Sequence, residues 1–337
     1  MNRREMFLKV LSHATLVAGS GFCYSCASGK RHRDSSAPGG HTEQTSAPLK
    51  PDKKQSHEMP PNASEPVHLH KSPESSIHRQ AGNGHHALKN QNQRQLTPEE
   101  KIKLRDFDKS HPGDLFVPVH KRKILSSCFK KLSLVKKYVG YGHFNLLSFD
   151  QMLIYSKLAA APDGFTPAEL EFLEEVFYFD AEKYGFYGKK LNHSLTEAIS
   201  DSNIVKIVGS GHYLYKDSSL PIYNKIIKDV GQTLILTSGI RSVVKQMHLF
   251  LGKTLSVNGN FSQASRSLAP PGHSYHAVGD FDVGKKGLGS FNFTNKFSET
   301  DEYKKLTDLG YIDIRYPTDN PFGVRFEPWH IEGTGHT

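Results

Sequence analysis

The stretch from Gly29 to Gln95 most constrains this chain, because it lacks the apolar residues that a folded core needs. It is rich in Ser, Pro, His, Gln, Asn and Lys, has few aromatic residues and shows no sustained apolar period. Such a segment cannot bury enough surface to offset the conformational entropy that folding removes. We therefore expect residues 29–95 to form a disordered tether. Its histidines could bind metal loosely, but we favour a solvated linker.

The first residues have the layout of an export signal. Arg3 and Arg4 precede a modestly apolar run from Met6 to Phe22, as in a twin-arginine signal. A membrane span needs about 20 apolar residues, so we favour a cleaved leader over a retained anchor. Lipid attachment at Cys23 or Cys26 stays open. The prediction is an exported protein of the periplasm or cell envelope, with membrane proximity only through its N-terminus.

Helix signals begin where the tether ends. Thr97 and Thr166 are each followed by proline and, three residues after the threonine, by glutamate, which is the pattern of a capped helix start. Ser148 opens a third helix. The aromatic and aliphatic residues after Thr166 have close to helical spacing and should form a buried face. Residues 96–210 are therefore predicted to be mainly helical.

The pattern changes after Leu220. Helices are predicted at Pro221 to Val230 and Val243 to Leu255, with a buried strand at 233–237 between them and short strand-like runs at 281–283 and 324–326. Helices followed by short strands predict an α+β domain with a small mixed or antiparallel sheet and flanking helices. The predicted organisation is a leader at 1–28, a tether at 29–95, a helical region at 96–210 and a catalytic domain at 211–337.

Charge and cysteine content exclude some classes of function. The net charge of +9 suits an acidic partner such as the bacterial wall or nucleic acid. Nucleic-acid binding is not expected, because no recognition motif accompanies the charge and the leader directs export. Cys128 is the single cysteine of the body and is predicted to be a small buried apolar residue. The oligomeric state cannot be deduced from the sequence.

Three downstream segments carry residues suited to chemistry. They are Ser238 to Ser242, Pro271 to Asp282 and Glu327 to His330. Two histidines and one carboxylate make a common catalytic zinc set, because three protein ligands leave a fourth position open. Neutral imidazole suits Zn²⁺, and a carboxylate offsets part of its charge. The combination of these segments indicates a metal centre more strongly than any single histidine does.

These segments resemble the D-alanyl-D-alanine carboxypeptidase family of zinc peptidases, with its VanY-type and VanX-type members. That family carries a Ser-x-His-x-x-Gly-x-Ala-x-Asp motif, an upstream Ser-Gly-Tyr-Arg-Ser-like segment and a late Glu-x-x-His segment. The residues that match these three segments are Ser274, His276, Gly279, Arg241, Glu327 and His330, and Gln246 and Phe250 continue the upstream helix as in the VanY branch. The resemblance covers residues 220–332.

One departure concerns the metal-binding aspartate. The family places it seven residues after the first histidine, whereas Asp282 lies six residues after His276 and the seventh position is Val283. We interpret this as a one-residue deletion in the turn. Asp280 would point to the same face of a strand as Asp282 and is the rival ligand. We favour Asp282 and leave Asp280 open.

The resemblance implies zinc-dependent hydrolysis of D-Ala-D-Ala or a related D-amino-acid bond in peptidoglycan stem peptides. It implies zinc ligands at His276, Asp282 and His330, a general base at Glu327 and an oxyanion-stabilising Arg241. Ser274 and Gln246 are candidates for substrate binding or for shaping the local turns.

Other readings of the sequence stay open. An L,D-carboxypeptidase or a crosslink endopeptidase is the alternative within enzymes, and a non-catalytic wall-binding module is the alternative of another class. Residues 211–215 are predicted to line the cleft in which the substrate would bind.

Overall fold

Capping residues begin the helices that the sequence predicted. In the computed structural model, which describes residues 94–159, 164–312 and 314–333, Thr97 and Thr166 each form a complete capping box with the glutamate three residues on. Ser148 exchanges hydrogen bonds with Gln151 in the same way. The first part of the described chain contains α3 (Pro98–Arg105), α4 (Arg122–Val139), α5 (Tyr141–Phe144), α6 (Phe149–Ala159) and α7 (Pro167–Tyr178).

The predicted leader and nearly all of the predicted tether lie outside the described residues. Within the described ranges, every helix is too short or too polar to cross a bilayer.

The second part of the described chain combines helices with short strands. Its elements are β1 (Ile204–Ile207), β2 (His212–Tyr215), α8 (Ser219–Val230), β3 (Leu234–Ser238), α9 (Val243–Ser256), α10 (Phe261–Ser265), β4 (Phe281–Lys285), α11 (Asp301–Asp308) and β5 (His330–Ile331). Short 3-10 turns lie at 119–121, 181–184, 201–203, 275–277, 289–293 and 295–299. The α+β class predicted from the sequence is confirmed. The predicted boundary at 210 falls in the turn of the β1–β2 hairpin and stays a prediction.

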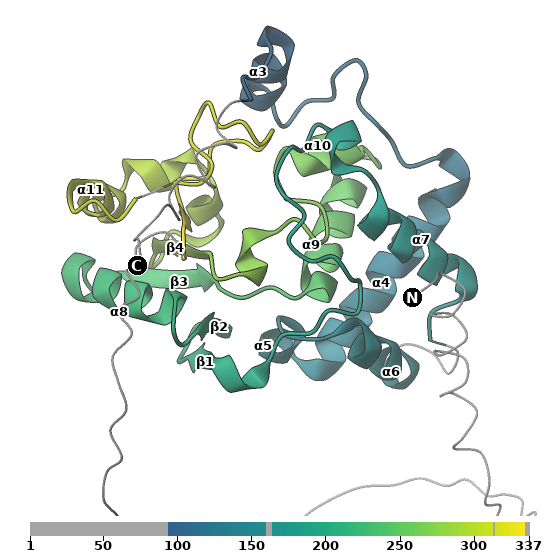
Figure 1. Cartoon of the computed structure of the whole chain (residues 1–337), viewed down its shortest axis with the longest axis horizontal. Helices are drawn as coiled ribbons and strands as arrows, with labels where there is room; N and C mark the ends of the chain where they lie inside the picture. The colour runs from purple at the N-terminus through teal and green to yellow at the C-terminus, as the bar shows by residue number, and fades with distance from the viewer. Residues whose placement is uncertain (1–93, 160–163, 313, 334–337) are drawn as a thin grey trace, which may run out of the picture. The chain divides into compact units, whose positions relative to one another are not determined.

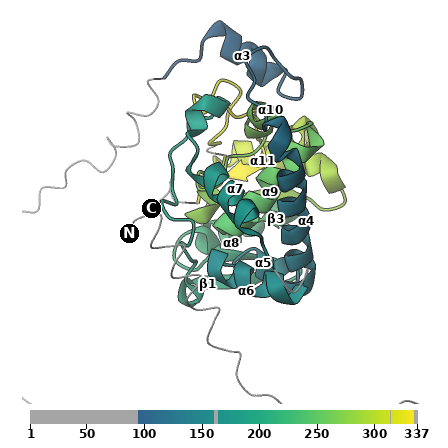
Figure 2. The same ribbon diagram turned by 90° about the vertical axis from the view of Figure 1, so that its right-hand side faces the viewer.

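Two apolar clusters hold these elements. The helical core joins α4, α6, α7 and α9, and it includes Cys128, which is fully buried as predicted. The sheet core packs α8 and α11 against β3 and β4. Figure 1 shows the two groups of elements on opposite sides of the molecule, and Figure 2 shows α4 running along α9. The aromatic stripe of α7 is buried in the helical core through Phe172, Val176 and Phe177, as its spacing predicted.

The three-stranded sheet is antiparallel and has the order β3-β4-β5. Asp282 of β4 pairs with Ser238 on one side and with His330 on the other. The register between β3 and β4 shifts between Leu236 and Ser238, which marks a bulge beside the chemical groups. The sheet therefore aligns residues from three distant segments in one row.

The prediction of a strand at 324–326 is wrong. Arg325 donates its backbone N–H to Arg266, and the carbonyl of Val324 accepts from the side chain of Asn320. Arg266 lies at the end of α10 and Asn320 lies in a loop. Hydrogen bonds to these partners do not form the ladder of a β-sheet. The strand near this point is β5, which begins at His330.

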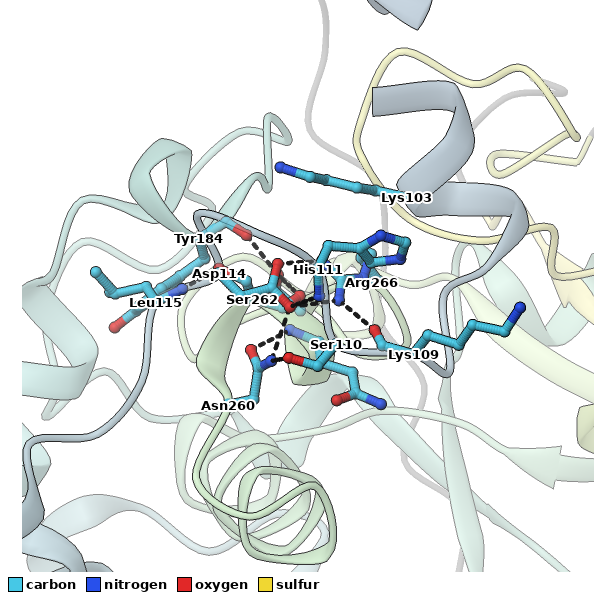
Figure 3. A network of polar contacts seen from close by, with 12 residues as sticks. Lys103, Lys109, Ser110, His111, Asp114, Leu115, Tyr184, Asn260, Ser262 and Arg266 are labelled. Carbon is cyan, nitrogen blue, oxygen red and sulfur yellow. Dashed lines mark hydrogen bonds and ion pairs between the residues drawn. The ribbon is translucent and has the colours of Figure 1, made fainter. Parts of the chain in front are cut away.

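A buried ion pair ties the segment before α4 to the end of α10. Arg266 donates from both terminal nitrogens to Asp114, at 2.9 Å each, and both side chains are almost fully buried. Asn260 also donates to Asp114, and Arg266 donates to the carbonyl of Lys109, so the pair has several further partners (Figure 3). The network thus fixes the backbone of Arg266, whose carbonyl holds the loop that leads to Glu327.

We expect Asp114→Asn to lower the free energy of unfolding at pH 7 by about 3 kcal/mol, because it leaves the buried charge of Arg266 without its counterion. Burial opposes ionisation, but the hydrogen bonds from Arg266 lower the pKa of Asp114 from 3.8 to about 2. Stability from this carboxylate is therefore present above its unfolded pKa and is lost as the pH falls toward about 2. Urea unfolding at pH 7 and pH 3 measures both effects.

The control for Asp114→Asn is Asp106→Asn, which removes a partly exposed carboxylate that lies 3.5 Å from Lys109. We expect the control to change stability only slightly, because an ion pair between exposed side chains contributes little. Equal losses in the two variants, or a loss at Asp114 that does not shrink at acidic pH, would contradict the assignment.

Candidate active site

A turn and two strands bring His276, Asp282 and His330 together. One ligand atom from each lies within 4.8 Å of the other two, and all three side chains are buried. The Oδ1 atom of Asp282 lies 3.3 Å from Nε2 of His276 and 3.2 Å from Nδ1 of His330. No hydrogen bond satisfies this buried oxygen. Two imidazole nitrogens and an unsatisfied carboxylate oxygen that converge in this way fit a zinc ion.

Hydrogen bonds on the outer ring nitrogens orient the two histidines. Nδ1 of His276 contacts the carbonyl of Gly239 at 2.8 Å, and a carbonyl can only accept. Nδ1 therefore carries the proton, and Nε2 faces the cluster with a free lone pair. Nε2 of His330 contacts a carboxylate oxygen of Asp280 at 2.9 Å, which leaves its Nδ1 facing the cluster. Such outer partners set the tautomer and orientation of metal-binding histidines.

Gly239 is required for the first of these contacts. A Cβ atom at this position would lie 2.1 Å from the carbonyl oxygen of Tyr213 in β2. That carbonyl accepts from the N–H of Ile240, so the turn after β3 lies directly against β2. Glycine thus allows the backbone that holds His276 to approach the hairpin.

Asp280 lies on the outer side of His330. Its oxygens also accept from Nε of Arg315 at 2.5 Å, from Nη2 of Arg315 at 3.2 Å and from the N–H of Gly333 at 3.0 Å. Burial opposes its charge, but the bonds from His330 and Arg315 lower the pKa of Asp280 to about 2. The structure therefore brings Asp282, rather than its rival Asp280, to the two inward-facing nitrogens. One residue fewer in the turn after His276 still places Asp282 opposite His330.

The charged groups of the cluster change one another's pKa values. Burial and the nearby Arg241 lower the pKa of His276 to about 4. Burial also opposes the charge of His330, but its hydrogen bond to Asp280 and the nearby carboxylate of Asp282 raise the pKa of His330 to about 9. Burial works against ionised Asp282 too, yet His276 and Arg241 hold its pKa well below 3.8. Ionised Asp282 therefore presents a negative oxygen at the point where a cation would lie.

Glu327 lies beside the cluster without joining it. Its Oε2 is 4.0 Å from Nδ1 of His330, and the carbonyl of Glu327 accepts from the N–H of His330 in the tight turn that joins them. Burial raises the pKa of Glu327 to about 7, although Arg325 and His330 oppose the shift. A carboxyl group with such a pKa can both take and release a proton near neutral pH.

Arg241 lies two residues beyond the turn residue Gly239 that follows β3, and it points at Asp282. Its Nη2 lies 2.5 Å from Oδ2 of Asp282, and its Nε donates to the hydroxyl of Ser238 at 2.8 Å. Ser242, the next residue, caps α9 by accepting from the N–H of Lys245. The cap and the strand end thus hold the guanidinium at the edge of the cluster.

A cavity of about 410 Å³ opens onto these groups and is lined by Arg241, His276, Asp282, Glu327 and His330. Ser274 and Gln246, the predicted substrate-binding residues, also line it. Gln246 donates to the carbonyl of Ala269 at 2.7 Å, while its Oε1 is buried without a hydrogen bond. All seven predicted site residues therefore border one cavity.

The prediction that residues 211–215 line the cleft is wrong, because none of them borders the cavity. They form β2 and its turn, and they support the wall from behind. The carbonyl of Tyr213 holds Ile240, and the ring of His212 contacts Tyr141.

Sequence reasoning missed several residues of the cavity wall. Tyr141 comes from the helical region, far upstream of the motifs, and no local pattern marks it. Tyr316 and Arg325 come from the irregular segment before β5. Among these residues, only Lys245 could have been noticed in the sequence, because it places a charge between apolar residues in the first turns of α9. Arg315 lies outside the wall but supports it through Asp280.

Comparison with solved structures returned partial matches of low overall similarity. A structure of the LdcB LD-carboxypeptidase is 25% identical, with a TM-score of 0.35, over 41% of this chain and 70% of that chain. A mutant of the vancomycin-resistance D,D-pentapeptidase VanY with Zn(II) is 25% identical, with a TM-score of 0.31, over 39% and 78%. The D,D-dipeptidase VanXYg with a D-Ala-D-Ala phosphinate analogue is 24% identical, with a TM-score of 0.34, over 40% and 56%.

Comparison with curated proteins returned no match. The family model of VanY, D-alanyl-D-alanine carboxypeptidase, matches residues 222–336. This range contains Arg241, His276, Glu327 and His330, which match the family's motifs, and it also contains Asp282. Residues 222–336 of this chain therefore match the family model of VanY, D-alanyl-D-alanine carboxypeptidase, to which the sequence motifs pointed.

Proposed function

We propose that this protein is a zinc-dependent carboxypeptidase that hydrolyses D-Ala-D-Ala, or a related D-amino-acid bond, in the stem peptides of peptidoglycan. The observation that carries the proposal is the buried set of His276, Asp282 and His330 beside Glu327, inside a segment that matches the VanY family model. An enzyme of this kind acts outside the cytoplasm, which agrees with the predicted export and envelope location.

His276 Nε2, Asp282 Oδ1 and His330 Nδ1 would hold the zinc, and Asp280 and Gly239 would orient the two imidazole rings. When bound, zinc supplies a Lewis acid that polarises a carbonyl and makes a water molecule more acidic. The chain itself supplies the proton transfer and further stabilisation of charge.

Glu327 takes a proton from the attacking water and passes it to the leaving amine. The raised pKa of this buried carboxyl group suits both halves of that transfer. Arg241 donates to the oxygen of the scissile carbonyl as negative charge develops there, an interaction that strengthens in the transition state. Ser274 and Gln246 position the peptide along the cavity wall.

Two alternatives act on the same wall polymer. The LdcB neighbour is described as an LD-carboxypeptidase, so cleavage of an L,D bond is the alternative exopeptidase reaction, and cutting of crosslinks is the endopeptidase one. A non-catalytic wall-binding module has no need of a buried acid beside the metal-facing histidine. Glu327 therefore favours an enzyme.

The first prediction concerns the metal ligands. We expect Asp282→Ala to abolish stoichiometric zinc binding, because it removes the carboxylate between the two histidines. Asp280→Ala should keep one zinc at saturation but weaken its affinity by about 10- to 100-fold, the usual effect of removing an outer partner. Chelator competition and elemental analysis of the full chain measure both. The opposite ranking of the two variants would make Asp280 the ligand.

The second prediction separates chemistry from metal binding. We expect Glu327→Gln to keep the zinc and lower kcat by about 10²- to 10⁴-fold, because the amide is nearly isosteric but cannot accept the proton. Glu302→Gln is the matched control, since Glu302 is a buried carboxylate of α11 paired with Lys285 away from the cavity. Near-normal turnover by zinc-loaded Glu327→Gln would exclude Glu327 as the base.

The third prediction identifies the scissile bond. We expect the purified protein to release terminal D-alanine from a pentapeptide stem and to leave tetrapeptide stems and crosslinked dimers intact. Mass spectrometry of defined muropeptides measures the products, with zinc-loaded Glu327→Gln as the blank. Shortening of the tetrapeptide would establish the L,D activity, cleavage of dimers the endopeptidase, and binding without any cleavage the wall-binding module.

A further inference from the structure

Lys245 is a buried cation in the cavity wall that has no anionic partner among the described residues. It lies in the first turn of α9 and is only 5% exposed. Its Nζ lies 4.6 Å from the centre of the Tyr141 ring and 6.0 Å from that of Phe144. No carboxylate forms an ion pair with it in the described ranges, and the charges that act on it, from Arg241 and Lys136, are both positive.

Three other buried or half-buried lysines of the described residues are partnered. Lys131 lies 2.7 Å from the buried carboxylate of Glu169, Lys285 lies 2.9 Å from Glu302, and Lys190 donates to a backbone carbonyl at 2.6 Å. Burying an ammonium group without such a partner is costly, and aromatic rings offset only part of that cost. Burial lowers the pKa of Lys245 to about 7, with Arg241 adding to the shift. An anion next to Nζ would remove this cost.

The position of Lys245 indicates which anion that is. It borders the same cavity as Arg241 and Glu327, with Tyr141 covering it from the helical region. Asp282 has its oxygens directed at Arg241 and the two histidines, and Glu327 lies beside His330, so neither carboxylate of the described cavity wall forms an ion pair with Lys245. The partner must therefore enter with the substrate.

We propose that Lys245 binds the C-terminal carboxylate of the stem peptide and thereby selects free chain ends over internal bonds. The inference rests on the proposed peptidase function, since that carboxylate is separated from the scissile carbon by only the amide nitrogen and one α-carbon. A peptide bound for hydrolysis beside Glu327 and Arg241 brings this group into the same cavity. Lys245 is then a specificity residue that contacts substrate and takes no part in proton transfer.

The test compares Lys245→Met with wild type on two substrates, acetylated D-Ala-D-Ala peptides that end in a free carboxylate or in an amide. We expect KM for the acid to rise about 10- to 100-fold, the usual worth of a charged hydrogen bond, with kcat nearly unchanged. Kinetics on the amide should not change, because Lys245 has no carboxylate to bind there. Lys245→Arg should recover part of the loss.

Lys136→Met is the matched control. It removes a positive charge near Lys245 without touching the cavity, so it should change neither substrate's KM. Zinc content and the thermal midpoint should be maintained in Lys245→Met, since methionine suits a buried site. Equal losses on the acid and the amide, or no loss on either, would overturn the proposal.

A binding measurement separates this inference from the proposed function. Calorimetric titration of the zinc-loaded full chain with N-acetyl-D-alanine and with its amide needs no turnover. We expect the acid to bind more tightly to wild type and the preference to vanish in Lys245→Met. A preference that persists in Lys245→Met overturns the inference even if the enzyme is active. A preference that vanishes supports it even if neither peptide is cleaved, an outcome that would count against the proposed function alone.

Discussion

The pairing of β4 with both of its neighbours is the constraint on which the site depends. Asp282 lies between Ser238 of β3 and His330 of β5, and neither neighbour is close to it in the chain. Side chains alternate along a strand, so a slip of one residue would turn Asp282 away from the histidines. The apolar residues of β3 and β4 buried in the sheet core, such as Leu236 and Val283, prevent that slip because they would have to exchange places with polar ones.

The buried charged groups around Ser238, Asp282 and His330 stabilise one another rather than the fold as a whole. Asp280 is held by Arg315 and Gly333, and Asp282 by Arg241, so each of these two buried carboxylates has a cation or a backbone donor. Such pairs seldom add net stability, since desolvation offsets most of their attraction. Their value here is positional, because they fix the tautomer of His330 and the direction of the inward-facing nitrogen and oxygen atoms.

The helical region completes the site as well as supporting it. α9 belongs to the helical core, yet its first turn carries Lys245 and Gln246 into the cavity wall. Tyr141 of α5 closes the wall over Lys245. Segments that lie far apart in the chain therefore share one cavity, which gives the residues before 211 a part in the site that the motifs alone do not reveal.

The sequence by itself determined the local features and the list of chemical groups. Capping at Thr97 and Thr166, the strand at β3 and the motif residues follow from short-range patterns, because caps, periodicity and motif spacing act over a few residues. Only the tertiary structure shows that Asp282 meets the inward nitrogens while Asp280 contacts the outer nitrogen of His330, since neither aspartate has the family's spacing and the strand register sets their positions. The tertiary structure also places Tyr141 and Lys245 in the cavity wall and residues 211–215 outside it. Contacts of this kind depend on the packing of distant elements, which no local pattern encodes.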